Sequence, residues 1–210
     1  MLVTLTDVSK GFLDETILEK INMSINEGDK IGLMGVNGAG KTTLLNIIAG
    51  VLPCDEGTVS KKSNLEIGYL QQNEALDDDN TLEEEIKSAL ERTYTVRKLM
   101  AEISAKMASA DVGSDEYKCL ESEYAALDNE YTALDGYTAD ARINRVLTGL
   151  GFRDFDLKMK TSALSGGEKM RFGMAKILLR NPELLILDEP TNHLDFSMLA
   201  WLEDYIKSYK

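Results

Sequence analysis

The feature that most constrains the fold is a glycine-rich stretch, residues 35–43, that fits the pattern G-x-x-x-x-G-K-[ST]. It reads Gly35, Val36, Asn37, Gly38, Ala39, Gly40, Lys41, Thr42 and Thr43. Glycines let the backbone curl so that its N–H groups point inward at phosphate oxygens. Lys41 supplies a charge for the β- and γ-phosphates, and the hydroxyl of Thr42 is a ligand for Mg²⁺. The sequence therefore predicts a phosphate-binding loop.

The residues that flank this loop have the pattern that such a loop requires. Residues 30–34 predict a buried strand that enters the loop, and residues 42–49 predict a helix that leaves it. Phosphate would then lie at a helix N-terminus, where free N–H groups and the helix dipole favour anions. This context distinguishes the stretch from an ordinary glycine-rich turn.

Length and composition limit the classes of protein to consider. The 210 residues suffice for one large domain, or for one domain with an insertion, and 43% hydrophobic residues support a sizeable core. The net charge of −13 argues against a general nucleic-acid-binding surface. Two cysteines, Cys54 and Cys119, and one histidine, His193, suggest a reducing compartment and no metal cluster. No segment reads as a signal peptide or membrane span, so we expect a cytoplasmic protein without direct membrane insertion.

The chain changes character twice along its length. Residues 1–80 contain short strands, such as residues 65–70, around the phosphate loop. From residue 81 to about residue 150 the pattern is helical, and residues 151–210 return to mixed strand and helix. We therefore expect a helical subdomain between two parts of one α/β core.

The helical segment contains two heptad seams, which are narrow apolar stripes with charged residues on the other faces. The first seam is Leu82, Ile86, Ala89, Thr93, Val96, Met100, Ile103 and Met107. The second is Tyr117, Leu120, Tyr124, Leu127, Tyr131 and Leu134. A break around Gly113 suits a tight reversal, so we expect two antiparallel helices over about residues 81–136. Narrow seams favour a projecting hairpin over the alternative of two helices packed flat on the core.

Further motifs follow in a fixed order. Leu164-Ser165-Gly166-Gly167-Glu168 precedes a helical pattern, and residues 184–187 form an apolar run typical of a strand covered on both faces. Asp188 and Glu189 come directly after this run, and Thr-Asn-His-Leu-Asp follows at residues 191–195. Together with the phosphate loop, this order closely resembles that of ATP-binding cassette (ABC) ATPases. The resemblance covers essentially residues 1–205.

The resemblance implies an α/β fold of the P-loop ABC type. Such a fold has a mixed or parallel sheet core, an N-terminal antiparallel β-subdomain and, here, an inserted helical hairpin arm. It also implies ATP and Mg²⁺ as ligands. The metal would be held by Thr42, Gln72 and Asp188, with Gln71 as an adjacent competitor of Gln72. Glu189 would polarise the attacking water as the catalytic carboxylate.

Two further site assignments follow from the same resemblance. Phe12 stands where the family often places an aromatic ring against adenine, although a core aromatic is an equal alternative. Ser165, Gly166, Gly167 and Glu168 form the family's signature, which acts in trans on ATP held by a second ABC unit. His193 lies too close to Glu189 to be the family's switch histidine, so we expect it to fix its turn.

Three features are similar to subfamily F (ABC-F): the motif at residues 191–195, Lys-Met-Arg after the signature, and the long helical insertion. Members of this subfamily carry two ATPase units on one chain, and many bind the ribosome. In that analogy the arm would reach ribosomal RNA, a ribosomal protein or transfer RNA, and a role in antibiotic resistance is one possibility. The chain ends before the switch strand, so the resemblance implies that the C-terminal part of a first ATPase unit is missing.

The charge of the arm bears on these partners. Residues 82–135 contain 13 acidic and 6 basic residues, a net charge of −7. Basic residues cluster on the first helix, at Arg92, Arg97, Lys98 and Lys106, and could touch RNA locally. The alternative function is that of a transport ATPase that pairs with a separate membrane subunit. A DNA-repair ATPase would normally carry a far longer coiled coil.

Overall fold

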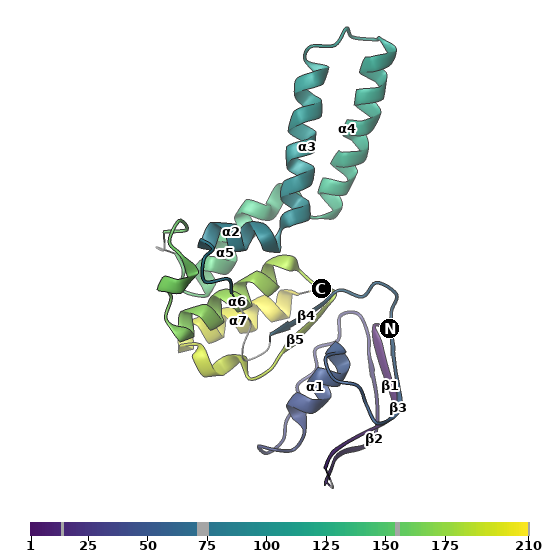
Figure 1. Cartoon of the computed structure of the whole chain (residues 1–210), viewed down its shortest axis with the longest axis vertical. Helices are drawn as coiled ribbons and strands as arrows, with labels where there is room; N and C mark the ends of the chain where they lie inside the picture. Colours follow the sequence, from purple (N-terminus) through teal and green to yellow (C-terminus); the bar gives the residue numbers. More distant parts are fainter. Residues whose placement is uncertain (14, 71–75, 154–155, 210) are drawn as a thin grey trace. The chain divides into compact units, whose positions relative to one another are not determined.

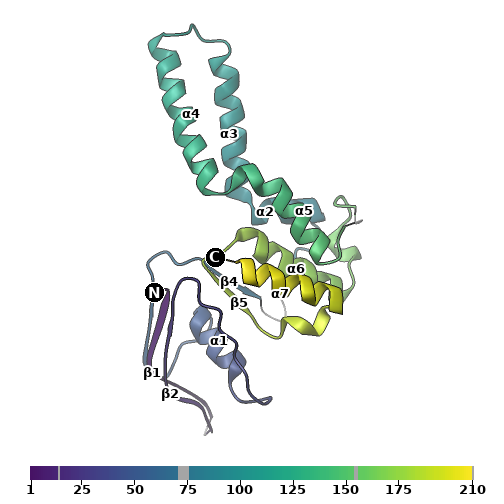
Figure 2. The same ribbon diagram turned by 180° about the vertical axis from the view of Figure 1, so that it is seen from behind.

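The computed structural model describes residues 1–210 except residues 14, 71–75, 154–155 and 210, and the side chain of His193. The chain divides into two compact units. The first consists of residues 1–75 and 181–210, and the second of residues 76–180. The helices and strands of both units are labelled in Figure 1, and Figure 2 shows them from behind.

An antiparallel sheet of three strands forms the N-terminal part of the first unit. β1 (Val3–Phe12) lies between β2 (Glu15–Ile25) and β3 (Glu56–Lys61). Val3 of β1 is paired with Ile25 on one side and with Lys61 on the other. Successive side chains of a strand point to opposite faces, so β1 buries mainly alternate residues against the core. The expected N-terminal antiparallel sheet is confirmed.

The helix that follows the glycine-rich loop packs on this sheet. α1 (Lys41–Ala49) begins at the predicted place and ends at Gly50, whose positive φ closes the helix. Its buried face shares one hydrophobic core with the strands, formed by Leu2, Val3, Leu5, Val8, Leu18, Ile25, Leu44, Ile47, Ile48 and Ile186. The loop is therefore followed directly by a packed helix, and its Gly40 approaches Ile17 and Leu18 of β2.

A second sheet in this unit pairs two distant segments. β4 (Ile67–Leu70) and β5 (Leu184–Leu187) lie in parallel, with Tyr69 opposite Ile186. A short 3₁₀ helix, η3 (Pro190–His193), and α7 (Phe196–Ser208) follow β5. We expected β5 to be covered on both faces, but only Ile186 is buried and its three neighbours are half-buried. With β4 as its partner among the described strands, β5 lies in a narrow sheet that other elements only partly cover.

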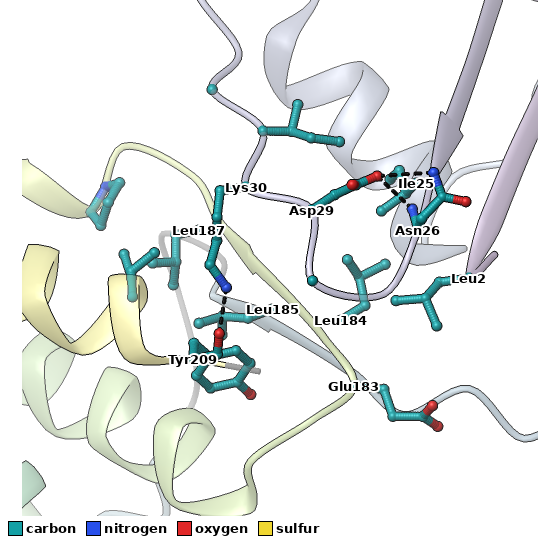
Figure 3. Close-up of a pocket in the computed structure, with 15 residues that line it drawn as sticks. Leu2, Ile25, Asn26, Asp29, Lys30, Glu183, Leu184, Leu185, Leu187 and Tyr209 are labelled. Atoms are coloured by element: carbon teal, nitrogen blue, oxygen red, sulfur yellow. Dashed lines mark hydrogen bonds between the residues drawn. The ribbon is translucent and has the colours of Figure 1, made fainter.

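The expected strand at residues 30–34 is wrong. These residues form no strand, and Ile31, Leu33 and Met34 are 49%, 40% and 93% exposed. A strand needs a neighbour that accepts and donates its backbone hydrogen bonds, and none of the described strands pairs with this segment. Residues 29–32 instead line a cavity of about 390 Å³ together with Leu184, Leu185 and Leu187 (Figure 3). In this cavity Lys30 Nζ donates to the Tyr209 carbonyl at 2.5 Å.

The second unit is helical. Its elements are α2 (Leu82–Ala89), α3 (Glu91–Met107), α4 (Asp115–Ala133), η1 (Gly136–Thr138), α5 (Ala139–Gly149), η2 (Thr161–Ala163) and α6 (Gly166–Arg180). Both α2 and α5 pack against α6. None of the described helices is both long and apolar enough to cross a membrane.

α3 and α4 form the predicted hairpin and lie side by side in Figures 1 and 2. We call this hairpin the arm. Its core consists of buried Val96, Met100 and Tyr131, against which Tyr124, Leu127 and Leu134 pack. The chain reverses at residues 108–114, where Gly113 has a φ of +89° and Ser114 caps α4. The arm thus has its own small core, and its other faces are largely exposed.

The first predicted helix of the arm is divided in two. Leu90 is both the C-cap of α2 and the N-cap of α3, and its φ of −118° and ψ of 26° lie outside the helical range. The reason is that the continuous seam serves two different partners. Its first residues, on α2, face α6, whereas its later residues, on α3, face α4. A single straight helix cannot turn one stripe toward both.

Candidate nucleotide-binding site

One cavity of the first unit brings together residues that lie far apart in the sequence. It has a volume of about 270 Å³ and draws on β1, β2, the glycine-rich loop with the start of α1, and the segment after β5. The lining residues are Phe12, Ile17, Asn37, Gly38, Gly40, Lys41, Thr42, Thr43 and Glu189. The predicted aromatic residue, the phosphate loop and the predicted catalytic carboxylate therefore share one space.

The conformation of the loop depends on its glycines. Gly38 and Gly40 have φ angles of +84° and +85°, a region that side chains disfavour. At Gly40 a Cβ atom would also lie 2.7 Å from Ile17 Cγ2 and 3.0 Å from Leu18 Cδ2. Glycine is thus needed at Gly40 both for the backbone angle and for the close approach of β2.

The N-terminus of α1 is open to an anion. Gly40 caps it without a side-chain hydrogen bond, and its first turn contains no acidic residue. By contrast, α2 has a threonine cap and three glutamates in its first turn. The first N–H groups of a helix have no intrahelical partner, and they carry the positive end of its dipole. At α1 these groups lie at the cavity, where phosphate oxygens could satisfy them.

Lys41 folds back over its own loop. Its Nζ atom donates to the carbonyl oxygens of Gly35 at 2.9 Å and of Val36 at 3.0 Å. Neutral carbonyls bind an ammonium group less strongly than anionic oxygens do. Phosphate oxygens in the cavity could therefore compete for Lys41 without any change in the backbone.

Glu189 and Asp188 lie in different surroundings. Glu189 lines the cavity, has a φ of +49°, and accepts a hydrogen bond from Asn192 Nδ2 at 3.1 Å. Asp188 is 8% exposed and directly follows β5. Burial raises the pKa of the Tyr69 phenol, and the negative charge of Asp188 raises it further. The left-handed backbone at Glu189 costs about 1–3 kcal/mol, and such strain often occurs at functional sites.

Phe12 is available to a ligand. Its ring is 48% exposed and lines the cavity, which excludes the core alternative. Lys10 Nζ lies 5.6 Å from the ring centroid and forms an ion pair with Asp55 at 2.5 Å. Asp55 also accepts the backbone N–H of Gly11 at 2.9 Å, and these hydrogen bonds hold its pKa below the ordinary value. The segment that carries Phe12 is therefore tied to the chain before β3.

The metal assignments can be compared only in part with the structure. Thr42 lines the cavity, and Asp188 directly precedes Glu189, which also lines it. Gln71 and Gln72 lie outside the described residues, as does the side chain of His193. Within the described chain no group of three His, Cys, Asp or Glu side chains could hold a metal alone. One hydroxyl and one carboxylate suit Mg²⁺, which commonly takes its remaining ligands from substrate phosphates and water.

The signature residues belong to the second unit and begin α6. Ser165 Oγ and Ser165 N donate to Glu168 Oε2 at 2.6 and 2.7 Å, the arrangement of a capping box. Gly166 and Gly167 have open space where a Cβ atom would lie. α2 also begins with a capping box, which Thr81 and Glu84 form. The position that corresponds to Gly166 is occupied there by Leu82, which is fully buried. A cap therefore does not need the glycines, which leave the first turn of α6 accessible.

Sequence reasoning missed Ile17 and the support beneath Phe12. Ile17 lines the cavity and fixes the approach to Gly40. An apolar residue next to buried Leu18, on the outward face of β2, was the available signal. The pair of Lys10 and Asp55 joins residues 45 positions apart, and no local pattern indicates such a contact.

Comparison with known proteins adds to this geometry. The sequence pattern that defines a family described as ABC transporter matches residues 18–192. The chain is 41% identical over 209 residues to the ATP-binding protein YdiF of Bacillus subtilis (strain 168), covering 100% of this chain and 32% of YdiF. It is 35% identical over 213 residues to ABC transporter F family member 5 of Arabidopsis thaliana, covering 98% of this chain and 30% of that protein.

A third relative is the energy-dependent translational throttle protein EttA of Escherichia coli (strain K12). The identity is 37% over 194 residues, which cover 92% of this chain and 34% of EttA. The chain thus spans about a third of the length of these curated relatives. A solved structure described as the ATP-binding subunit of an ABC transporter matches with a TM-score of 0.68 at 21% identity. That match covers 99% of this chain and 74% of the other, and it concerns the fold.

Proposed function

Since the chain belongs to the ABC transporter family, we propose that it binds and hydrolyses ATP as one ATPase unit of an ABC-F protein that acts on the ribosome. The observation that carries the ATPase part is the cavity shared by Phe12, the phosphate loop and Glu189. Adenine would lie against Phe12, and the phosphates would lie along residues 35–43. The γ-phosphate would then lie toward Glu189.

Each residue of the cavity has a distinct task in this proposal. The loop N–H groups and Lys41 bind the phosphates, and Thr42 with Asp188 would hold Mg²⁺, which neutralises charge on the transferring phosphoryl group. Glu189 accepts a hydrogen bond from, and so orients, the attacking water. Its backbone lies in the left-handed region, and its side chain lines the cavity.

The signature turn completes the site of a second ATPase unit. Its open first turn offers the N–H groups of Gly166 and Gly167 and the positive end of the α6 dipole. Glycine is a poorer helix former than alanine, and no atom lies within 4 Å of where a Cβ atom of either residue would be. Access for a ligand is the compensating gain. A second unit, in the same full-length chain or in a dimer, is therefore the first partner that we propose.

The ribosome is proposed as the second partner through the arm. The name of EttA refers to translation, and this chain resembles it over 92% of its residues. Three of the four basic residues that we considered for RNA contact lie in exposed ion pairs. Arg92 pairs with Glu130, Arg97 with Asp140, and Lys98 with Glu102. The net charge of −7 over residues 82–135 favours contact with a ribosomal protein over contact with RNA along α3.

Sedimentation with ribosomes, with ATP binding and hydrolysis measured in parallel, tests the proposal on the full-length protein. Purified protein should sediment with ribosomes in the presence of ATP, and Glu189→Gln should increase the bound fraction because ATP is retained. Lys41→Ala is the matched control, which should lose both ATP binding and ATP-dependent sedimentation. A parent protein that hydrolyses ATP but never sediments with ribosomes would overturn the ribosomal part alone.

The alternative, a transport ATPase with a separate membrane subunit, has one observation in its favour. The solved structure quoted above is described as such a subunit. The arm argues against it, because two helices of 17 and 19 residues have a core of their own and exposed outer faces. Co-purification with a membrane protein, without ribosomes, would support the transporter.

A further inference from the structure

Two ion pairs join the start of α2 to α6 in the second unit. Asp78 pairs with Lys169 at 2.5 Å, and Glu85 pairs with Lys176. Lys169 and Lys176 are seven residues apart on α6, which is two helical turns, so both lie on one face. Asp78 and Glu85 have the same separation along the chain. The two pairs therefore align this segment along α6.

The inner pair is buried and almost fully bonded. The side chains of Glu85 and Lys176 are 3% and 10% exposed, whereas those of Asp78 and Lys169 are 67% and 33% exposed. The second carboxylate oxygen of Glu85 accepts Asn80 Nδ2 at 2.7 Å. Burial raises the pKa of Glu85, but the bonds from Lys176 and Asn80 outweigh it and lower the pKa overall. Such a pair holds one geometry because either ion left alone would be buried without a partner.

Each end of this connection leads to a functional element. From Glu85, α2 runs through buried Leu90 directly into α3, the first helix of the arm. From Lys176, α6 runs back to its first turn, where Ser165 and Glu168 form the signature cap. The arm and the signature turn are thus connected through α2, the buried pair of Glu85 and Lys176, and α6.

The second helix of the arm, α4, also ends near a helix that packs on α6. Gly136 follows α4 and allows the ring of Tyr131 to approach the backbone, since a Cβ atom there would overlap that ring. Asp135 then faces Arg142 of α5 at 3.9 Å, and α5 packs on α6. Both ends of the arm therefore meet helices that lie against α6.

We propose that Glu85 and Lys176 are positioning residues that couple the arm to the signature turn. Displacement of the arm by its partner moves α2, and the buried pair transmits this movement to α6 and so to Ser165–Glu168. The proposal rests on the proposed function, because it makes the arm's partner a regulator of ATP hydrolysis. A well-packed apolar pair could stabilise the same fold, but it would lack the directional bonds that transmit a small displacement.

The first test is a double-mutant cycle read by hydrogen exchange in the full-length protein. Val96→Ala loosens α3 against α4, because Val96 is fully buried in the core of the arm. We expect exchange of the amides of residues 165–169 to rise about threefold or more. In the Glu85→Met, Lys176→Met double variant, which restores apolar packing, Val96→Ala should leave that exchange unchanged. Lys87→Met is the matched control, since it breaks only the exposed pair with Glu83 on the same helix.

The outcomes of this cycle separate coupling from mere stability. A double variant that responds to Val96→Ala as the parent does would overturn the proposal. Thermal unfolding first establishes that the double variant is folded. If it is not, the conservative single variant Glu85→Gln, which keeps the shape of the side chain but removes its charge, takes its place and should reduce the response of residues 165–169. An unreduced response there would equally overturn the proposal.

The second test is steady-state hydrolysis with and without ribosomes. Ribosomes should change kcat in the parent and in Lys87→Met, and the double variant should lose this change while its KM for ATP stays the same. If ribosomes have no effect on the parent, the proposed function fails. The exchange cycle, which needs neither ribosomes nor ATP, still decides on the coupling.

Discussion

Ser165 and Glu168 cap the first turn of α6 reciprocally. The backbone N–H of Glu168 donates to Oγ of Ser165 at 3.4 Å. In return, the Ser165 hydroxyl and backbone N–H both donate to Oε2 of Glu168, at 2.6 and 2.7 Å. These two bonds, that of the hydroxyl first, hold the pKa of Glu168 below its ordinary value. The charge of Glu168 therefore stabilises the turn that carries the signature glycines.

This relationship predicts a pH-dependent contribution to stability. Because the folded-state pKa of Glu168 is depressed, its contribution is present above the unfolded pKa of about 4.3 and is lost as pH falls through the folded pKa. Melting temperatures of the parent and of Glu168→Gln should differ near pH 6 and converge toward pH 3. Glu203→Gln, at an exposed position of α7, is the control and should show no such convergence. A constant difference across this range would contradict the assignment.

Lys41→Ala should weaken ATP binding about 10- to 100-fold, because one charge-assisted contact to phosphate is lost. Isothermal titration calorimetry with MgATP measures the effect. Lys207→Ala, an exposed lysine of α7, is the control for the change in net charge. Equal affinities for the parent and Lys41→Ala would show that the phosphate loop does not bind ATP.

Phe12→Ala should lower the affinity for ATP by about 1–3 kcal/mol, since an exposed aromatic ring in the cavity can stack on a base. Inorganic tripolyphosphate has no base, so its affinity should not change. Phe12→Trp should retain ATP binding. A loss of affinity that is the same for both ligands would mean that Phe12 acts through the loop and not through adenine.

Glu189→Gln should reduce kcat about 10²- to 10⁴-fold and leave the affinity for ATP nearly unchanged. The amide keeps the shape of the side chain but accepts a proton poorly. Single-turnover hydrolysis by the full-length protein, with nucleotide binding measured in parallel, checks both parts. Parent-like turnover would show that another group orients the attacking water.

Lys176→Met should destabilise the fold by about 3–5 kcal/mol, because it leaves Glu85 buried without its cation. Chemical denaturation measures the free energy of unfolding. The Glu85→Met, Lys176→Met double variant should recover most of this loss. Additive losses in the double variant would show that the two side chains do not depend on each other.

The fold class expected from the sequence is confirmed, and local patterns explain why. α1, β5 and each of the two helices of the arm are specified by a pattern within fewer than thirty residues, so the sequence alone reveals them. Residues 30–34 have an equally apolar pattern but form no strand, since a strand also requires a partner from elsewhere in the chain. The break at Leu90 was hidden for a related reason: the seam is continuous, and only the packed structure shows that it serves two partners.

The candidate site was predictable in its chemistry but not in its framework. The spacing within residues 35–43 specifies a phosphate loop, and the structure gathers this loop with Phe12 and Glu189 around one cavity. No spacing rule indicates that Ile17 would press against Gly40, because β2 and the loop meet only in the folded chain. The roles of these residues in binding and hydrolysis stay predictions until the variants above are measured.

The unpaired residues 30–34 have a consequence for handling the protein. Exposed Ile31 and Met34 lie on a backbone whose hydrogen-bonding groups have no strand partner in the described chain. β5 pairs with β4 along one edge, and none of the described strands pairs with its other edge. Bare apolar edges of this kind template pairing between molecules. Concentrated samples of these 210 residues should self-associate through intermolecular β-structure. Low concentration and low ionic strength, which leaves the repulsion between chains of net charge −13 unscreened, should keep them dispersed.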